Sequence, residues 1–127
     1  MTDRHPIVSS SFNRTLTTCA TARDGRHSAT TFDLSITVHF APLDPWQPHV
    51  YTSLRSTHQR QWEDFDHWLS LYVDGHDLTG TLDFAPTPER IALYLARVLA
   101  GMAPEAVGLS LASGNEHHSI AWAESDE

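Results

Sequence analysis

A strictly alternating stretch at positions 31–40 constrains the fold more than any other feature of the sequence. Apolar side chains occupy every second position of TFDLSITVHF, and polar side chains fill the positions between them. A strand points successive side chains to opposite faces of its sheet, so this pattern predicts a half-buried central strand over Thr31–Phe40. Its apolar face requires a covering layer, and only two helical patterns downstream are long enough to supply one.

Three further strands are expected around this one. The Ser/Thr-rich segment Ile7–Thr17 has an alternating pattern, and the connection Thr18–Thr30 contains an Asp-Gly turn dipeptide, so the two strands form a long hairpin. Near the end of the chain, Val107–Leu111 alternates again and Ser113–Asn115 is a turn sequence. A fourth strand follows this turn and runs through Ile120 and Trp122.

The segment after the central strand carries three prolines within seven positions, which predicts an irregular loop holding Trp46 and Tyr51. Apolar residues then recur at helical spacing over Gln61–Val73, which predicts an amphipathic helix. Asp74-Gly75 is expected to end this helix, with the glycine in the C-cap region.

A second helix is predicted over Pro88–Ala100. Thr87 supplies an N-cap hydroxyl, proline stands at the first helical position, and Glu89 places an acid in the first turn. The element order is then ββααββ, with no internal repeat. We therefore expect one α+β domain over residues 1–127, with a four-stranded antiparallel sheet and both helices on one face.

The composition excludes several classes of function. The net charge is −8, the chain has no Lys and its eight Arg do not cluster, so nucleic acid is not an expected partner. Cys19 is the only cysteine, which rules out an intrachain disulfide and a Cys-rich zinc site. The sequence has no signal-peptide pattern and no apolar run of membrane-spanning length, so we expect a cytoplasmic protein without a membrane partner.

The order of elements and three short motifs resemble the family of 6-pyruvoyl-tetrahydropterin synthases and 6-carboxytetrahydropterin synthases. Asp64-Phe65 is similar to the family's Asp-Phe at its first helix, Pro86–Glu89 to its Pro-Thr-x-Glu helix start, and Ser119–Trp122 to the pattern of its last strand. The resemblance covers Phe12–Trp122 and implies the tunnelling fold. It also implies a homo-oligomer, since the family closes its sheet edges in trimeric barrels that stack into hexamers, with active sites between subunits.

The family's zinc ligands are not matched. The family binds zinc through a His late in its first strand and a His-x-His entering the second, and the matching positions hold Ser28, Thr30 and, in the first strand, Asn13 or Arg14. His27 is close, but on a regular strand it shares parity with Asp33 and points to the opposite face. A one-residue bulge would turn it inward, yet it would supply one ligand where three are needed. No metal site is therefore expected, and zinc remains only an implication of the resemblance.

The resemblance also suggests a catalytic set. The family uses a Cys ahead of the His-x-His for proton transfer and an Asp-His pair after its first helix. Cys19 lies upstream at a longer spacing, Asp74 matches the Asp, and His76 follows with Gly75 in the place of the His. A carboxylate beside an imidazole suits acid/base work near neutral pH. A helix C-cap followed by a polar turn explains the same residues, and a lone cysteine is more often an inert small hydrophobe.

A Glu in the last hairpin anchors the pterin in the family, and Glu116, His117 and His118 surround that position here. A carboxylate accepts two N–H groups from an amidine-like edge, and an imidazole adds a switchable donor. A polar hairpin end explains the same residues without a ligand. We assign substrate binding to these three residues and to His27, near the family's metal position.

Two hypotheses follow. The first is a divergent enzyme, independent of zinc, that performs proton-transfer chemistry of the lyase, cyclase, isomerase or condensation type, with biosynthesis in specialised metabolism as its suggested setting. Its substrate would be a small polar or heteroaromatic metabolite. The alternative is a non-catalytic binding or assembly subunit on the same scaffold. Analogy of fold alone does not decide between them.

Overall fold

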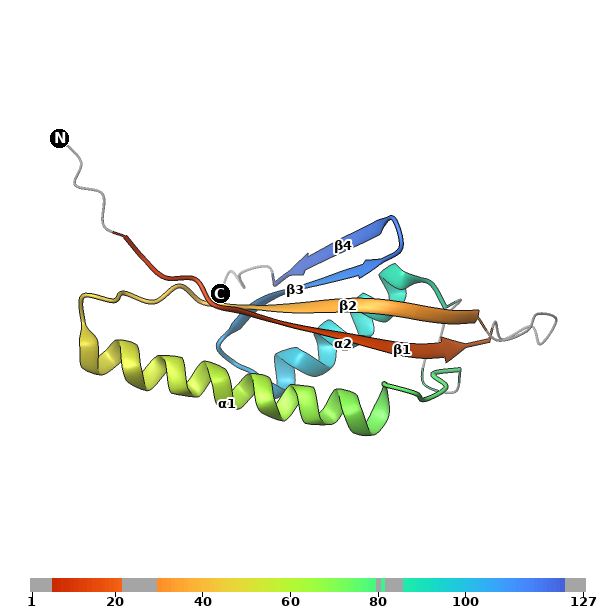
Figure 1. Cartoon of the computed structure of the whole chain (residues 1–127), viewed down its shortest axis with the longest axis horizontal. Helices are drawn as coiled ribbons and strands as arrows, with labels where there is room; N and C mark the ends of the chain where they lie inside the picture. Colours follow the sequence, from red (N-terminus) through yellow and green to blue (C-terminus); the bar gives the residue numbers. More distant parts are fainter. Residues whose placement is uncertain (1–5, 22–29, 80, 82–85, 123–127) are drawn as a thin grey trace, which may run out of the picture.

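The computed structural model describes residues 6–21, 30–79, 81 and 86–122. The elements follow the predicted ββααββ order (Figure 1). They are β1 (Ser11–Ala20), β2 (Thr30–Phe40), α1 (Pro48–Tyr72), α2 (Pro88–Met102), β3 (Ala106–Ser113) and β4 (Glu116–Ala121). Neither helix combines the length and apolarity that a membrane crossing demands.

The strands form one antiparallel sheet in the order β1-β2-β3-β4, so β2 is central, as the alternating pattern predicts. The register places Leu16 opposite Leu34 and Ile36 opposite Leu111. Residues of one parity on each strand therefore share a face, which we call the inner face. The other parity forms the open face.

The inner face packs against both helices in a single core. The buried residues of β2 are its five apolar side chains, and α1 and α2 contribute apolar side chains at helical spacing. The main members are Phe32, Leu34, Ile36, Val38, Phe40, Phe65, Leu69, Ile91, Leu95, Leu99, Leu109 and Leu111. The expected α+β architecture, with two helices on one face of a four-stranded sheet, is confirmed.

The first helix begins much earlier than predicted. Pro48 occupies its first turn and Gln47 is the N-cap, so Tyr51 is helical rather than part of a loop. Proline suits the first turn because backbone N–H groups there have no acceptor within the helix, so the lack of an N–H costs no hydrogen bond. The early turns extend past the end of the sheet (Figure 1). They have less core to cover there, and their sequence shows no clear apolar stripe. The helix ends at Tyr72, and Val73 is its C-cap.

The first strand is shifted along the sequence relative to the prediction. Of the residues before Ser11, Val8 forms only an isolated bridge to Leu43. At the other end β1 continues to Ala20, because Thr18 and Ala20 keep the inward parity and are buried. The predicted Asp-Gly turn at positions 24 and 25 lies outside the described residues.

The remaining elements agree with the prediction to within two or three residues. The Thr87 side chain accepts a hydrogen bond from the Arg90 backbone N–H at 3.3 Å, as an N-cap should. Gly114 adopts a φ of 59° in the turn between β3 and β4, a conformation that favours glycine.

Candidate functional site

The segment that follows α1 lies along the outer edge of β1, which the sequence did not predict. The Gly75 N–H donates to the Thr17 carbonyl at 2.7 Å, and the Leu78 N–H donates to the Cys19 carbonyl at 2.8 Å. The Cys19 N–H in turn donates to the His76 carbonyl at 3.3 Å. This parallel pairing brings Cys19, Asp74 and His76, the three predicted catalytic residues, to one edge of the sheet.

The Asp74 carboxylate is held by two other residues at this edge. Its Oδ2 lies 2.8 Å from Arg14 Nη2, and its Oδ1 accepts the Thr17 N–H at 3.2 Å. Arg14 also donates to Asp66 Oδ1 and to the Asp66 carbonyl, each at 2.9 Å, and to the Ser70 hydroxyl. The Arg14 side chain is 19% exposed, and its guanidinium joins β1 to the last turns of α1.

The predicted carboxylate–imidazole pair is not formed among the described residues. Asp77, which follows His76 directly in the sequence, accepts both the Thr79 hydroxyl and the Thr79 backbone N–H, and these two hydrogen bonds lower the pKa of the Asp77 carboxyl. The His76 side chain is exposed, and its backbone carbonyl accepts the Thr18 hydroxyl at 2.7 Å. The imidazole is left accessible to a ligand.

Cys19 is a free, half-exposed thiol on the open face of β1. Its Sγ lies 3.9 Å from the His76 carbonyl oxygen, so the two residues lie on neighbouring segments of the same edge. The contact reaches the backbone of His76, and the structure shows no base beside the sulfur within the described residues.

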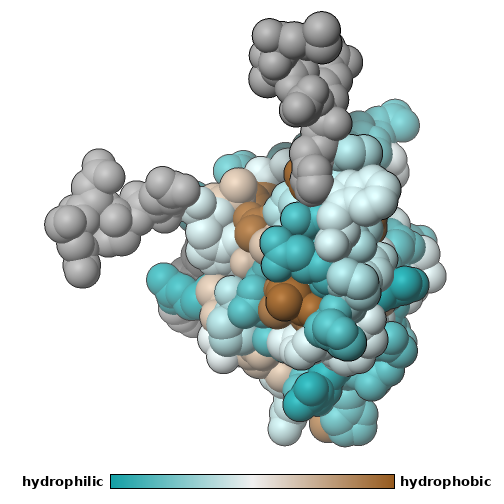
Figure 2. Space-filling model, turned by 90° about the vertical axis from the view of Figure 1, so that its left-hand side faces the viewer, coloured by the Kyte–Doolittle hydropathy of each residue, from teal (hydrophilic) through white to brown (hydrophobic). Residues whose placement is uncertain are grey.

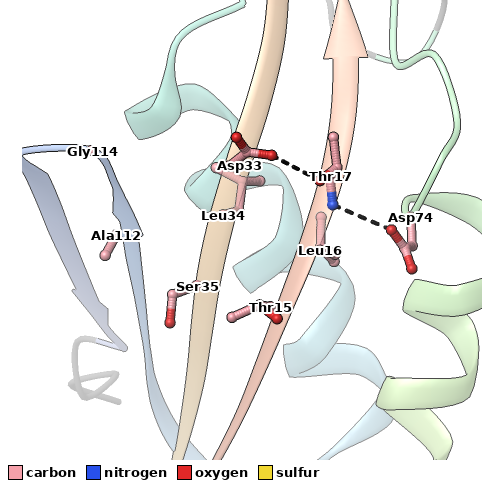
Figure 3. Close-up of a pocket in the computed structure, with 9 residues that line it drawn as sticks. All are labelled: Thr15, Leu16, Thr17, Asp33, Leu34, Ser35, Asp74, Ala112 and Gly114. Atoms are coloured by element: carbon pink, nitrogen blue, oxygen red, sulfur yellow. Dashed lines mark hydrogen bonds between the residues drawn. The ribbon is translucent and has the colours of Figure 1, made fainter.

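A groove of about 610 Å³ lies on the open face next to this edge (Figure 3). Its lining comes from β1, β2, the start of the segment after α1, and the β3–β4 turn, and comprises Thr15, Leu16, Thr17, Asp33, Leu34, Ser35, Asp74, Ala112 and Gly114. Thr17 stands between two carboxylates. Its hydroxyl donates to Asp33 Oδ1 at 2.8 Å, and its N–H donates to Asp74.

Asp33 is the groove residue that the sequence reasoning missed. It was assigned only to the polar face of the central strand. The signal available was its charge, because it is the one acidic residue in the alternating stretch 31–40.

The predicted substrate-binding residues lie on β4. Glu116 Oε2 is 3.1 Å from His118 Nε2, and both residues have the parity of the inner face. His117 points to the open face opposite Ala112 and lines a second hollow of about 340 Å³. Ser35 and Ala112 line both the groove and this second hollow, so the two are adjacent on the open face of the sheet. His27 lies outside the described residues.

Within one chain the two groups of predicted site residues lie on opposite edges. Strands β2 and β3 stand between β1 and β4, which corresponds to about 14 Å at the usual strand spacing. The folded chain therefore assembles the proposed catalytic residues and the proposed substrate anchors separately.

The positions that the resemblance assigns to zinc ligands hold other residue types where the structure describes them. Arg14 stands near the first ligand position, and its guanidinium is engaged by two carboxylates. Thr30 occupies one of the two β2 positions, and the other falls outside the described residues. No group of three His, Cys, Asp or Glu side chains suited to a metal ion occurs in the part of the chain that the structure describes.

Comparison with known proteins supports the fold. No family model matches the sequence, and no curated protein matches it by sequence. The structure is similar to that of 6-pyruvoyl tetrahydropterin synthase from Caenorhabditis elegans, with a TM-score of 0.62 and 11% sequence identity. The similarity covers 96% of this chain and 100% of that one. The chain thus has the scaffold of the pterin synthases.

Proposed function

We propose that this chain is a divergent enzyme on the pterin-synthase scaffold that performs acid/base chemistry on a small polar or heteroaromatic metabolite. The reaction would be a lyase, cyclase, isomerase or condensation step. The main support is that Cys19 lies beside Asp74 and His76 at one sheet edge, although it is more than fifty residues away from them in sequence. These are the residues that the family resemblance singles out for proton transfer.

The geometry suggests a division of roles. The exposed His76 imidazole is free to exchange protons with a substrate, and histidine is suited to this near neutral pH. The Asp74 carboxylate is held in position by Arg14 and the Thr17 N–H, so its oxygens are fixed at the end of the groove. Because no metal ligand set is proposed, hydroxyl and backbone N–H donors would stabilise developing charge.

A complete site would require a second copy of the chain. Thr17 and Cys19 turn their backbone groups to the outer edge of β1, so by strand alternation those of Ser11, Asn13 and Thr15 also point outward. No backbone partner for these three groups occurs among the described residues. Pairing of this edge with β4 of a neighbour would bring Glu116 and His118 toward the catalytic residues. We therefore propose a homo-oligomer, a trimer or hexamer as the family resemblance implies.

Turnover of a small-molecule extract, followed by mass spectrometry, tests the proposal. A variant with His76→Gln and His117→Gln is compared with wild type and with a control carrying His49→Gln and His67→Gln, two exposed histidines of α1. We expect the site variant to lose turnover by about 100-fold or more, as loss of an acid/base group usually costs. Equal turnover in all three proteins would contradict the proposed enzymatic function.

One observation favours the alternative of a non-catalytic binding subunit. Asp74 and Asp77 are both engaged with residues other than His76, as they would be in a purely structural turn. In that case no metabolite would be consumed by wild type, while ligand binding or assembly would persist in the site variant.

A further inference from the structure

Asp33 presents a carboxylate to the groove, and no described residue carries a cation that pairs with it. Its Oδ1 accepts the Thr17 hydroxyl, and its side chain is exposed on the open face. Its other oxygen has no hydrogen bond or ion pair with any described residue. Asp33 lies within the central strand β2, so its position is set by a rigid element rather than by a loop.

The described part of the chain offers Asp33 no positive neighbour. Arg14 is on the inner face and is already shared between Asp66 and Asp74. The other arginines with a described position lie on α1 and α2, across the core from the open face: Arg55, Arg60, Arg90 and Arg97. The sequence has no Lys, so none of the described Lys or Arg side chains serves as a counter-ion for Asp33.

Hydroxyl groups beside Asp33 are oriented by the sheet. Asn13 donates to Ser35 Oγ and to Thr37 Oγ1, each at 2.9 Å, so both hydroxyls keep their own hydrogens for another acceptor. The Thr17 hydroxyl donates to Asp33 and keeps free acceptor capacity. The groove thus sets an anionic acceptor next to neutral donors.

The groove has room because its floor carries small side chains. Thr15, Ser35, Ala112 and Gly114 surround the space above β2, and the volume of about 610 Å³ is in the range of small-molecule sites. Figure 3 shows Asp33 and Thr17 at one end and Ser35 on the same strand as Asp33.

We propose that this groove binds a small planar organic cation of the amidine type, with Asp33 as its counter-ion and the Ser35 hydroxyl as a donor to an adjacent oxygen. A flat group with several N–H donors matches a carboxylate better than a compact ammonium does. The inference deepens the proposed function, on which it rests for treating the Asp74 end of the groove as the substrate site.

Benzamidine, a planar amidinium cation, is a suitable probe, and neutral benzamide of nearly the same shape is its control. Titration of ¹⁵N-labelled protein is followed by amide chemical shifts in wild type, Asp33→Asn and Asp64→Asn. Asn keeps an oxygen that can accept the Thr17 hydroxyl, so the sheet should be preserved. Asp64 is exposed on α1 and carries the same charge away from the groove.

We expect benzamidine to shift the amides of Thr17, Asp33 and Ser35 and to bind roughly tenfold more weakly to Asp33→Asn, as loss of one charge-assisted hydrogen bond implies. Asp64→Asn should bind as wild type does. Equal binding of benzamide, equal weakening by Asp64→Asn, or no shift at millimolar benzamidine would overturn the proposal. So would Mg²⁺ or Ca²⁺ shifting the same amides while benzamidine does not.

The two proposals fail separately. Benzamidine binding at Asp33 together with no turnover of any metabolite would contradict only the enzymatic function. Turnover that depends on His76, together with no benzamidine binding, would contradict only the assignment of the ligand class.

Discussion

His58 is a fully buried histidine in the middle of α1. Its ring stacks on Phe40 with 4.7 Å between ring centroids and 20° between planes. Neither ring nitrogen has a hydrogen-bond partner in the described part of the chain. Burial lowers the pKa of His58 below its ordinary value of 6.5, and the charge of Glu105 opposes this shift in part.

Replacing His58 with Leu should stabilise the protein. A buried polar group without a partner costs about 1–3 kcal/mol, and an apolar side chain of similar size removes that cost. Loss of the stacking on Phe40 destabilises the variant by about 0.5–1.5 kcal/mol and offsets part of this gain. We therefore expect the free energy of unfolding to rise by roughly 1 kcal/mol at pH 7.5.

The advantage of His58→Leu should grow as the pH falls. The unfolded imidazole takes up a proton below pH 6.5, while the buried imidazole resists protonation, so proton uptake favours the unfolded wild type. The contribution of neutral His58 to the free energy of unfolding is complete above pH 6.5. It decreases as the pH falls from 6.5 to the lowered pKa of the buried imidazole. The loss is at most about 1.4 kcal/mol for each pH unit in this window.

Urea unfolding of wild type, His58→Leu and His67→Gln at pH 7.5, 6.5 and 5.5 measures this effect. His67 is exposed on the same helix, so its variant controls for the removal of a titrating histidine. The same pH dependence in wild type and His58→Leu would refute the reasoning, as would a loss of stability in the variant at pH 7.5.

Three further predictions concern stability and are measured by the same unfolding experiment. Arg14→Met should lower the free energy of unfolding by about 1–3 kcal/mol, because it leaves two half-exposed carboxylates without their cation, and a loss below about 0.5 kcal/mol would mean that the ion pairs contribute little. Gly101→Ala in α2 should raise the free energy of unfolding by about 0.5–1 kcal/mol, because alanine favours the helix and its Cβ would meet no atom within 4 Å. Gly114→Ala should lower it by about 1 kcal/mol, because a φ of 59° is strained for alanine although the Cβ would again meet no atom within 4 Å. Changes of equal sign in the two variants would contradict this explanation. Thr87→Ala should cost about 1 kcal/mol through loss of the N-cap, and Thr87→Ser should restore most of it.

The periodicity of the sequence was sufficient for the architecture. The alternation of Thr31–Phe40 and the apolar spacing of the two helices determine which side chains meet in the core, and both patterns persist in the structure. Periodicity did not locate the start of α1, because the turns before Gln61 extend past the sheet and need no continuous apolar stripe. The signal available there was Pro48, which fits a first helical turn as well as a loop.

The candidate site was less predictable, since it depends on contacts between distant segments. Family resemblance identified Cys19, Asp74 and His76, but no local pattern indicates that Gly75–Thr79 pairs with β1. Asp33 was taken for a solvated strand residue, because only the groove beside it distinguishes it from one. The engagement of Asp74 by Arg14 likewise connects positions sixty residues apart.

The proposed site is complete only where two groups of residues, on opposite edges of the sheet, meet between copies of the chain. Cys19 is the only cysteine and is half-exposed, so it can carry a nitroxide spin label through a thioether. Spin-labelled ¹⁴N chains are unfolded and refolded together with unlabelled ¹⁵N chains, and the amide signals of Glu116, His117 and His118 are compared before and after chemical reduction of the nitroxide. We predict that these signals are broadened in the mixed assembly and recover on reduction. Signals that are equally sharp in both states would contradict the shared site.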